Sequence, residues 1–469
     1  MNHRIWPAAV AIAAFALPAC ADTVEGVLVL RWGDGAPGAA IASRFEAALV
    51  ADDGNRFALD AASALRATGN LYRLNGQRVV VGATARRAHA EDALLVESIA
   101  PAPRTLAVAA PLAVSGAQPW VTLLCKFADS DDEPQPPAYF SAMLSNTTGR
   151  LDHYWREVSY GNIDLVGSEV GGWFKLPHPR SYYVPDDEGC NDGTRADLDT
   201  LWSDCTAAAD KEIDFSPFVG INTMYNGDLD GCAWGGGHYA TLDGVHKLWY
   251  STWERPWGYA NEAPLAHEMG HGFGLPHANN SDGDGDPYDN PWDVMSDAWD
   301  NATGSTTYGW LPKHLNIWSR DQLGWINAAR RLEIAADGVY DGIVLDRASL
   351  VGSSNRQMIV VTLPSPQPAT HYYTIEARKR TGTYEANLAG DAVIIHEVDT
   401  TRPEPSWSVD ADVPPADVSN NAGSMFKVGE NWTAPGGAFS VAVAAATADG
   451  FVVDVQRGAE RIFIDGFDP

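Results

Sequence analysis

Three histidines, one glutamate and three glycines fall within PLAHEMGHGFGLPH, at positions 264–277. His267 and His271 are four residues apart, so on a helix both imidazoles lie on one face and can bind the same ion. Glu268 points beside this pair, where it can act on a water molecule instead of binding the metal. The spacing therefore predicts a helix that carries both a metal site and a general base.

Glycine decides how the third histidine can reach the same ion. A glycine inside a helix costs up to about 1 kcal/mol relative to alanine, so we interpret Gly274 as the residue that ends the helix. The chain can then turn back, and His277 can approach the ion from another direction. Three histidines, one acid and one glycine at these offsets are expected by chance on the order of once in ten thousand chains of this composition.

Three imidazole ligands form a zinc site that keeps a fourth position open. Zinc lowers the pKa of a water molecule in that position to about 7. Glu268 can take a proton from this water as it attacks a carbonyl, and can pass the proton to the leaving amine. We therefore predict metal-assisted amide hydrolysis, with Glu268 as the catalytic base and His267, His271 and His277 as zinc ligands.

The helix that positions these residues is expected to begin near Asn261, because asparagine caps helix N-termini and Pro264 is tolerated in a first turn. Upstream, residues 120–129 form a continuous apolar run, which is typical of a strand buried on both faces. Residues 151–158 then show helical periodicity. Strands and helices alternate in this way over residues 115–330, which predicts a mixed α/β catalytic domain.

The flanking regions have a different character. Residues 22–110 consist of short apolar runs between turn residues and end in an Ala- and Pro-rich linker, so they predict a small N-terminal β domain or a removable pro-segment. Residues 331–457 are again strand-rich and predict a β-sandwich. Residues 1–21 have the basic start, short apolar core and small-residue cleavage site of a signal peptide. Residues 458–469 form a short C-terminal tail.

The pattern H-E-x-x-H-x-x-G-x-x-H at 267–277 resembles the signature of the metzincin zinc metalloproteases. Met295, in WDVMS, resembles the methionine turn that lies beneath the metal in that group. RLDHYWREVSYGNIDL at 150–165 and YYTIEAR at 372–378 are similar to the secreted peptidases related to immune inhibitor A and gametolysin. Immune inhibitor A-type enzymes commonly differ at the third ligand position, so His277 favours the gametolysin side.

The resemblance covers about residues 119–457 and implies a metzincin-type α/β (α+β) fold, with a mixed five-stranded sheet and the active-site helix on the floor of a cleft. It also implies an antiparallel edge strand above that helix, which holds a peptide substrate by backbone pairing. Residues 232–242, CAWGGGHYATL, are our candidate for this strand. Some metzincins carry a tyrosine two residues after the turn methionine; here that residue is Asp297, so no tyrosine is assigned. The N-terminal region contains no cysteine-switch motif.

A short acidic segment follows the third histidine. Its alternating carboxylates suit an oxygen-ligated calcium loop, although the run lacks the glycine and glutamate positions of an EF-hand. A bound Ca²⁺ would lock the chain between His277 and Met295, whereas the alternative is a solvated acidic loop without a cation. The candidate calcium ligands are Asp282, Asp284, Asp286, Asp289 and Asp293.

Charge and cysteine content limit the location and the partners of the chain. A formal net charge of −29 over 469 residues argues against a nucleic-acid partner. The apolar part of the signal peptide is too short to span a bilayer, and no later stretch is long enough. Without the signal peptide, four cysteines remain, which in a secreted protein predicts two disulfides with three possible pairings. Cys190 and Cys205 are close in sequence and are the first-choice pair; the other two are Cys125 and Cys232.

We therefore predict a secreted, monomeric zinc endopeptidase that acts on protein or peptide substrates. A periplasmic location, or a lipid anchor through Cys20 in the lipoprotein-like sequence LPAC, is the alternative for its location. The alternative function is a surface adhesion or glycan-binding protein in which the protease core is catalytically silent. Glu268 favours the enzyme, because a purely structural metal site does not need a general base.

Overall fold

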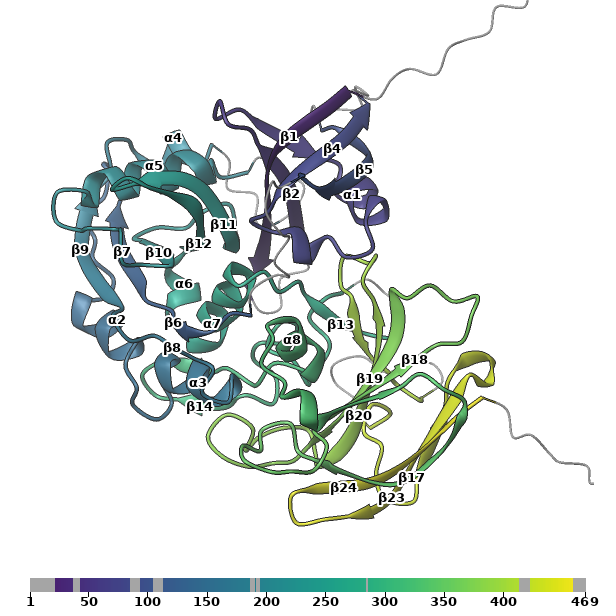
Figure 1. The fold of residues 1–469 in the computed structure, drawn as a ribbon. Helices are drawn as coiled ribbons and strands as arrows, with labels where there is room; N and C mark the ends of the chain where they lie inside the picture. Colours follow the sequence, from purple (N-terminus) through teal and green to yellow (C-terminus); the bar gives the residue numbers. More distant parts are fainter. Residues whose placement is uncertain are drawn as a thin grey trace, which may run out of the picture.

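The computed structural model describes residues 22–36, 43–84, 93–103, 113–185, 190, 195–283, 286–412 and 422–458. The predicted signal peptide with Cys20, the tail beyond Gly458, parts of the Ala- and Pro-rich linker, and Asp284 lie outside these residues. The described residues form a strand-rich, mixed α/β structure with several sheets (Figure 1). None of the described helices combines the length and the apolar character that a membrane crossing requires.

The largest sheet has ten strands. Its main order is β3-β2-β1-β11-β12-β10-β7-β9, and β4 and β5 extend it beside β1. β9, β7, β10 and β12 are parallel, whereas β11 runs antiparallel to β12. The strands are β1 (Asp22–Gly35), β2 (Arg44–Val50), β3 (Arg56–Leu59), β4 (Arg78–Thr84), β5 (Leu95–Pro101), β7 (Trp120–Lys126), β9 (Glu169–Lys175), β10 (Gly220–Tyr225), β11 (Cys232–Leu242) and β12 (Val245–Glu254).

Helices cover both faces of the part of this sheet that follows the linker. Side chains alternate along a strand, so Trp120 of β7 packs with α3 (Leu151–Val158) and α7 (Glu262–Gly272) on one face. Val121 packs on the opposite face with α5 (Leu198–Ala209). β7 is buried along nearly its whole length, as its continuous apolar run predicts, and β10 is buried at every position.

The other described helices are short. They are α1 (Ala61–Ala67), α2 (Pro137–Met143), α4 (Arg180–Tyr183), α6 (Pro256–Tyr259), α8 (Ile317–Gln322), and the 3₁₀ turns η1 (Tyr72–Leu74), η2 (Ala328–Arg330) and η3 (Pro435–Gly437).

Two disulfides lie on the α5 side of the sheet. Cys125 of β7 bonds Cys205 of α5, and Cys190 bonds Cys232 at the start of β11. The four cysteines therefore form two disulfides, as predicted, and these bonds indicate an oxidising compartment. The first-choice pair Cys190–Cys205 is wrong, because α5 packs with Cys205 toward β7, and this packing is not visible in the sequence.

Two further sheets contain the C-terminal strands. Ile375 and Val393 of one sheet share a core cluster with Val443 and Val455 of the other, so the two sheets pack as a sandwich. The first sheet has the order β13 (Ala278–Asn280), β21 (Ser406–Ser408), β20 (Ala392–Asp399), β19 (His371–Arg378), β18 (Met358–Thr362), β16 (Arg331–Ile334). The second has the order β17 (Gly338–Asp346), β24 (Gly450–Arg457), β23 (Phe439–Ala446), β22 (Asn431–Thr433). Two small sheets pair β6 (Gly116–Ala117) with β8 (Ile163–Asp164), and β14 (Thr303–Ser305) with β15 (Gly309–Leu311).

The N-terminal strands have a core cluster of their own and belong to the largest sheet. β1 pairs with β2 and β4 over much of its length, and its last residues, Arg31–Gly35, pair with Gly236–Cys232 of β11. The strands β9-β7-β10-β12-β11 are neighbours in the ten-stranded sheet, and β1 continues it beyond β11. Without β1, β11 would be an edge strand with unpaired backbone N–H and C=O groups.

We predict that non-reducing peptide mapping recovers Cys125 linked to Cys205 and Cys190 linked to Cys232. Replacing Cys125 and Cys205 by serine should lower the free energy of unfolding by about 2–5 kcal/mol, because that bond closes a long loop of 80 residues. Urea denaturation of the double variant, followed by tryptophan fluorescence, measures this loss. A recovered peptide that links Cys190 to Cys205 would contradict the fold described above.

Candidate metal centre

The end of α7 determines where the three histidines lie. Asn261 is the residue before the helix, as predicted, but its side chain donates to Trp257 O at 2.9 Å instead of capping the helix. Gly274 has a φ of +90°, the left-handed conformation that favours glycine. Its backbone N–H donates to His271 O at 2.9 Å, and that of Leu275 donates to Gly270 O at 3.1 Å. This turn ends the helix and reverses the chain, as the glycine predicted.

The three histidine side chains converge on one point. The Nε2 atom of His271 lies 3.0 Å from that of His267 and 3.1 Å from that of His277. All three residues are buried, with at most 3% of their surface exposed. The structure therefore brings together the three residues predicted as zinc ligands, although they come from a helix and from the segment after it.

Backbone carbonyls fix the orientation of two of these rings. His267 Nδ1 lies 2.6 Å from Val294 O, and His271 Nδ1 lies 2.7 Å from Leu275 O. Each of these Nδ1 atoms therefore donates a hydrogen, and the Nε2 lone pair is directed toward the other histidines. Burial also lowers the pKa of His271 to about 3, so this ring stays neutral, as a ligand must. Lone pairs that face each other in this way fit a bound cation.

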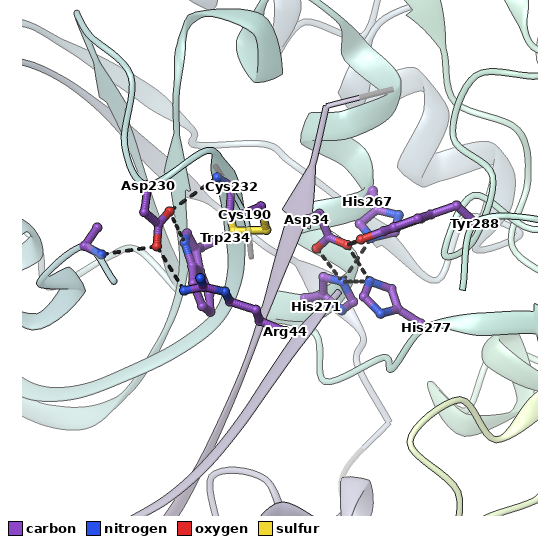
Figure 2. Close-up of a disulfide and its surroundings, with 11 residues drawn as sticks. Asp34, Arg44, Cys190, Asp230, Cys232, Trp234, His267, His271, His277 and Tyr288 are labelled. Carbon is purple, nitrogen blue, oxygen red and sulfur yellow. Dashed lines mark hydrogen bonds and ion pairs between the residues drawn. A yellow bond between two sulfur atoms is a disulfide. The ribbon is translucent and has the colours of Figure 1, made fainter. Parts of the chain in front are cut away.

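A fourth residue, Asp34, completes the cluster. Its carboxylate lies 2.6 Å from His277 Nε2, 3.4 Å from His271 Nε2 and 3.5 Å from His267 Nε2 (Figure 2). Among the described residues this is the one group of three or more His, Cys, Asp or Glu side chains that could hold a metal ion. Burial alone would raise the pKa of Asp34, but His277 and His267 hold it well below its usual value.

Sequence analysis did not identify Asp34. The residue is far from the histidines in the chain and reaches them only because β1 pairs with β11. Nothing in the local sequence around Asp34 distinguishes it from the other aspartates, so the only available signal would have been long-range strand pairing.

Glu268 lies next to the cluster and is also buried. Its Oε2 atom has no hydrogen-bond partner among the described residues. Burial, and then the nearby negative charge of Asp34, raise its pKa well above the usual value. A Cβ atom at Gly235 of β11 would lie 2.4 Å from Glu268 O and 2.8 Å from Glu268 Oε2, so glycine is required for β11 to lie directly on α7.

Met295, which the sequence predicts as the residue of a methionine turn, lies against α7. A Cβ atom at Gly270 would lie 2.5 Å from Met295 Sδ, so the methionine packs directly on the backbone of α7. Asp293 stabilises the turn, because its carboxylate accepts from Met295 N at 2.9 Å. The same turn presents Val294 O to His267.

The acidic segment does not gather around a second ion site among the described residues. Asp289 accepts from Asn280 N at 3.0 Å, Asp286 accepts from Tyr288 N at 3.0 Å, and Asp293 belongs to the methionine turn. No three carboxylates of this segment form a possible cation site in the part of the chain that the structure describes. Because Asp284 lies outside the described residues, the calcium site stays a prediction.

A tyrosine reaches the cluster from an unexpected position. The hydroxyl of Tyr288 donates to Asp34 Oδ1 at 2.6 Å, and its ring centre lies 5.6 Å from that of His277 (Figure 2). Asp297, the residue two positions after Met295, instead accepts from Lys313 Nζ at 2.6 Å in a buried ion pair. Tyr288 therefore presents a hydroxyl to the site from the loop that precedes the methionine turn.

Two further carboxylates, Glu262 and Glu254, are also buried. Glu262 is the first residue of α7, and Glu254 is the last residue of β12. Burial raises the pKa of both to about 8, and for Glu254 the charge of Asp34 adds to this effect. Both side chains are therefore largely protonated at neutral pH.

Neither a scan against models of known protein families nor a search of curated proteins finds a match to this chain.

We predict that the full chain binds one divalent ion. His271→Ala should weaken this binding by more than the roughly 10- to 100-fold that is typical when a residue that only hydrogen-bonds to a metal ligand is removed. The expected loss is larger because Nε2 of His271 lies close to both other imidazoles. Metal content after dialysis, and zinc titration by calorimetry, measure the effect. His246→Ala, which removes a histidine outside the cluster, should bind zinc as the parent does; equal binding by His271→Ala would contradict the site.

We also predict that Glu262→Gln removes part of the pH dependence of stability. Below about pH 4.5 both the folded and the unfolded states carry the proton on Glu262, and between about 4.5 and 8 only the folded state keeps it. The parent therefore loses stability as pH rises through this window. The glutamine side chain of the variant cannot titrate. Between about pH 5 and 8, the free energy of unfolding should therefore fall less in the variant than in the parent, and the difference between the two falls should be on the order of a few kcal/mol. Urea denaturation at both pH values measures this, and an identical loss in parent and variant would contradict it.

Proposed function

We propose that the chain is a secreted zinc endopeptidase of the metzincin type, which hydrolyses peptide bonds in proteins or peptides. The observation that carries the proposal is the convergence of three buried Nε2 atoms beside the carboxylate of Glu268. A purely structural site would explain the histidines but not an adjacent buried glutamate with an unpartnered oxygen among the described residues. The two disulfides support secretion into an oxidising compartment.

His267, His271 and His277 would hold the ion. When bound, zinc supplies a Lewis acid and a polarised water at its open position. Glu268 would accept a proton from that water and deliver it to the leaving amine.

The surrounding residues would bind and orient the substrate. The backbone of β11 lies directly on α7 at Glu268, so a peptide paired with β11 would pass over the catalytic base. The hydroxyl of Tyr288 is directed at the oxygen atoms of Asp34. It is therefore placed to donate to a carbonyl oxygen that becomes negative at the same position.

We predict that Glu268→Gln keeps its zinc but loses casein hydrolysis by about 100-fold or more, because the base that moves the proton is removed. Residues 22–110 include the predicted pro-segment, so hydrolysis is measured before and after mild trypsin treatment, with and without a chelator. Glu262→Gln changes another buried glutamate of the same helix and should cleave as the parent does. Hydrolysis by Glu268→Gln at the parent rate would contradict the role of the base. Stoichiometric zinc without chelator-sensitive cleavage in any form would favour an adhesion or glycan-binding protein.

A further inference from the structure

We infer that the last part of β1 is an intramolecular inhibitor of the proposed peptidase: it occupies the substrate position beside β11, and Asp34 fills the open position at the histidines. This inference rests on the proposed function and names how the same site is regulated. Three sets of contacts carry it.

The first is the position of the Asp34 carboxylate. It lies within 3.5 Å of all three Nε2 atoms, and only 4% of the residue is exposed. With an ion at the histidines, this carboxylate would be the nearest oxygen donor and would take the position that a water molecule needs. Glu268 would then have no water from which to accept a proton.

The second is the pairing of β1 with β11. Arg31 lies opposite Gly236, Trp32 opposite Gly235, and Asp34 opposite Ala233. β12 pairs with the other edge of β11, so both edges are occupied at Trp234, Gly235 and Gly236. An extended substrate that adds to a sheet needs a free edge, and the edge that β1 occupies becomes free only when β1 leaves.

The third is a set of side chains that hold β1 in this register. Arg31 donates from Nε to Gly237 O at 2.9 Å and from Nη2 to Asp199 at 2.6 Å. Trp32 stacks on His271, with ring centres 4.7 Å apart and an angle of 7° between the planes. Tyr288 donates to the carboxylate of Asp34.

The fit of the two strands is close at the backbone. A Cβ atom at Gly33 would lie 2.9 Å from the Trp234 ring, and one at Gly236 would lie 2.4 Å from Leu30 O. The segment 31–35 therefore matches the groove along β11 at both the backbone and the side chains.

Another interpretation of the same contacts is a closed structural site, in which Asp34 is a permanent fourth ligand. The two interpretations differ in what the removal of the carboxylate does. If Asp34 is an inhibitor, removing its carboxylate leaves a site that keeps its metal ion and is open to a substrate. If Asp34 is a structural ligand, removing its carboxylate leaves a site that loses the ion.

The test compares Asp34→Ala with the parent in the full, zinc-loaded chain, and uses Glu25→Ala as the matched control. Glu25 is an exposed carboxylate of the same strand that pairs with Arg78, away from the histidines. The probe is an acyl-dipeptide hydroxamate, whose binding is measured by calorimetry. Asp34→Ala should keep one zinc per chain and bind the probe at least about tenfold more tightly than the parent. Glu25→Ala should bind it as the parent does.

A second variant, Arg31→Ala, loosens β1 without changing any residue that touches the ion. It should also bind the probe more tightly, and backbone amides of β11 should exchange hydrogen faster than in Glu25→Ala. Loss of zinc from Asp34→Ala, or probe binding no tighter than the parent in both variants, would overturn the inference. Tighter probe binding without any peptide cleavage would support the inhibitory contact and contradict the peptidase. Equal cleavage by parent and Asp34→Ala would support the peptidase and overturn the inhibition.

Discussion

The metal centre depends on two backbone carbonyls that orient imidazole rings. Val294 O and Leu275 O engage the Nδ1 atoms of His267 and His271, so the Nε2 atoms face a common point. Leu275 O is available because α7 ends at the left-handed Gly274, and Val294 O because the chain turns at Met295. The helix end, the methionine turn and the ligands are therefore one structural unit, and none of them would have this geometry without the others.

A second constraint is the close approach of both β1 and α7 to β11. Gly235 lets the strand lie on the backbone of Glu268, and Gly236 lets Leu30 O of β1 approach from the other side. Both contacts leave no room for a Cβ atom. The glycines of β11 therefore allow both the proposed pairing of β11 with a substrate and its proposed inhibitory pairing with β1. Each pairing requires the backbone of β11 to lie close to the histidines and Glu268.

The part of the site that follows from local spacing could be predicted from the sequence. The repeat of a helix brings His267 and His271 together, and Gly274 predicts the turn that brings back His277. Asp34 and Tyr288 could not be predicted, because they reach the cluster through strand pairing and through a loop whose path depends on the whole fold. The disulfide pairing failed for the same reason: the partner of Cys205 is set by the packing of α5 on β7. The strands of 331–457 were predictable because short apolar runs bounded by turn residues are a local signal, whereas the joining of β1 to β11 was not.

The electrostatics of the site connects the metal to the inhibitory strand. Asp34, Glu254 and Glu268 are all buried, and the charge of Asp34 raises the pKa of the other two beyond the effect of burial. The negative charge of Asp34 therefore acts on both glutamates. A dication at the histidines would offset it, and its charge would attract the Asp34 carboxylate more strongly than the rings do. The hold of β1 on the site should therefore be tightest when the metal is bound, so under the proposed function the ion required for hydrolysis would also strengthen the proposed inhibitory contact.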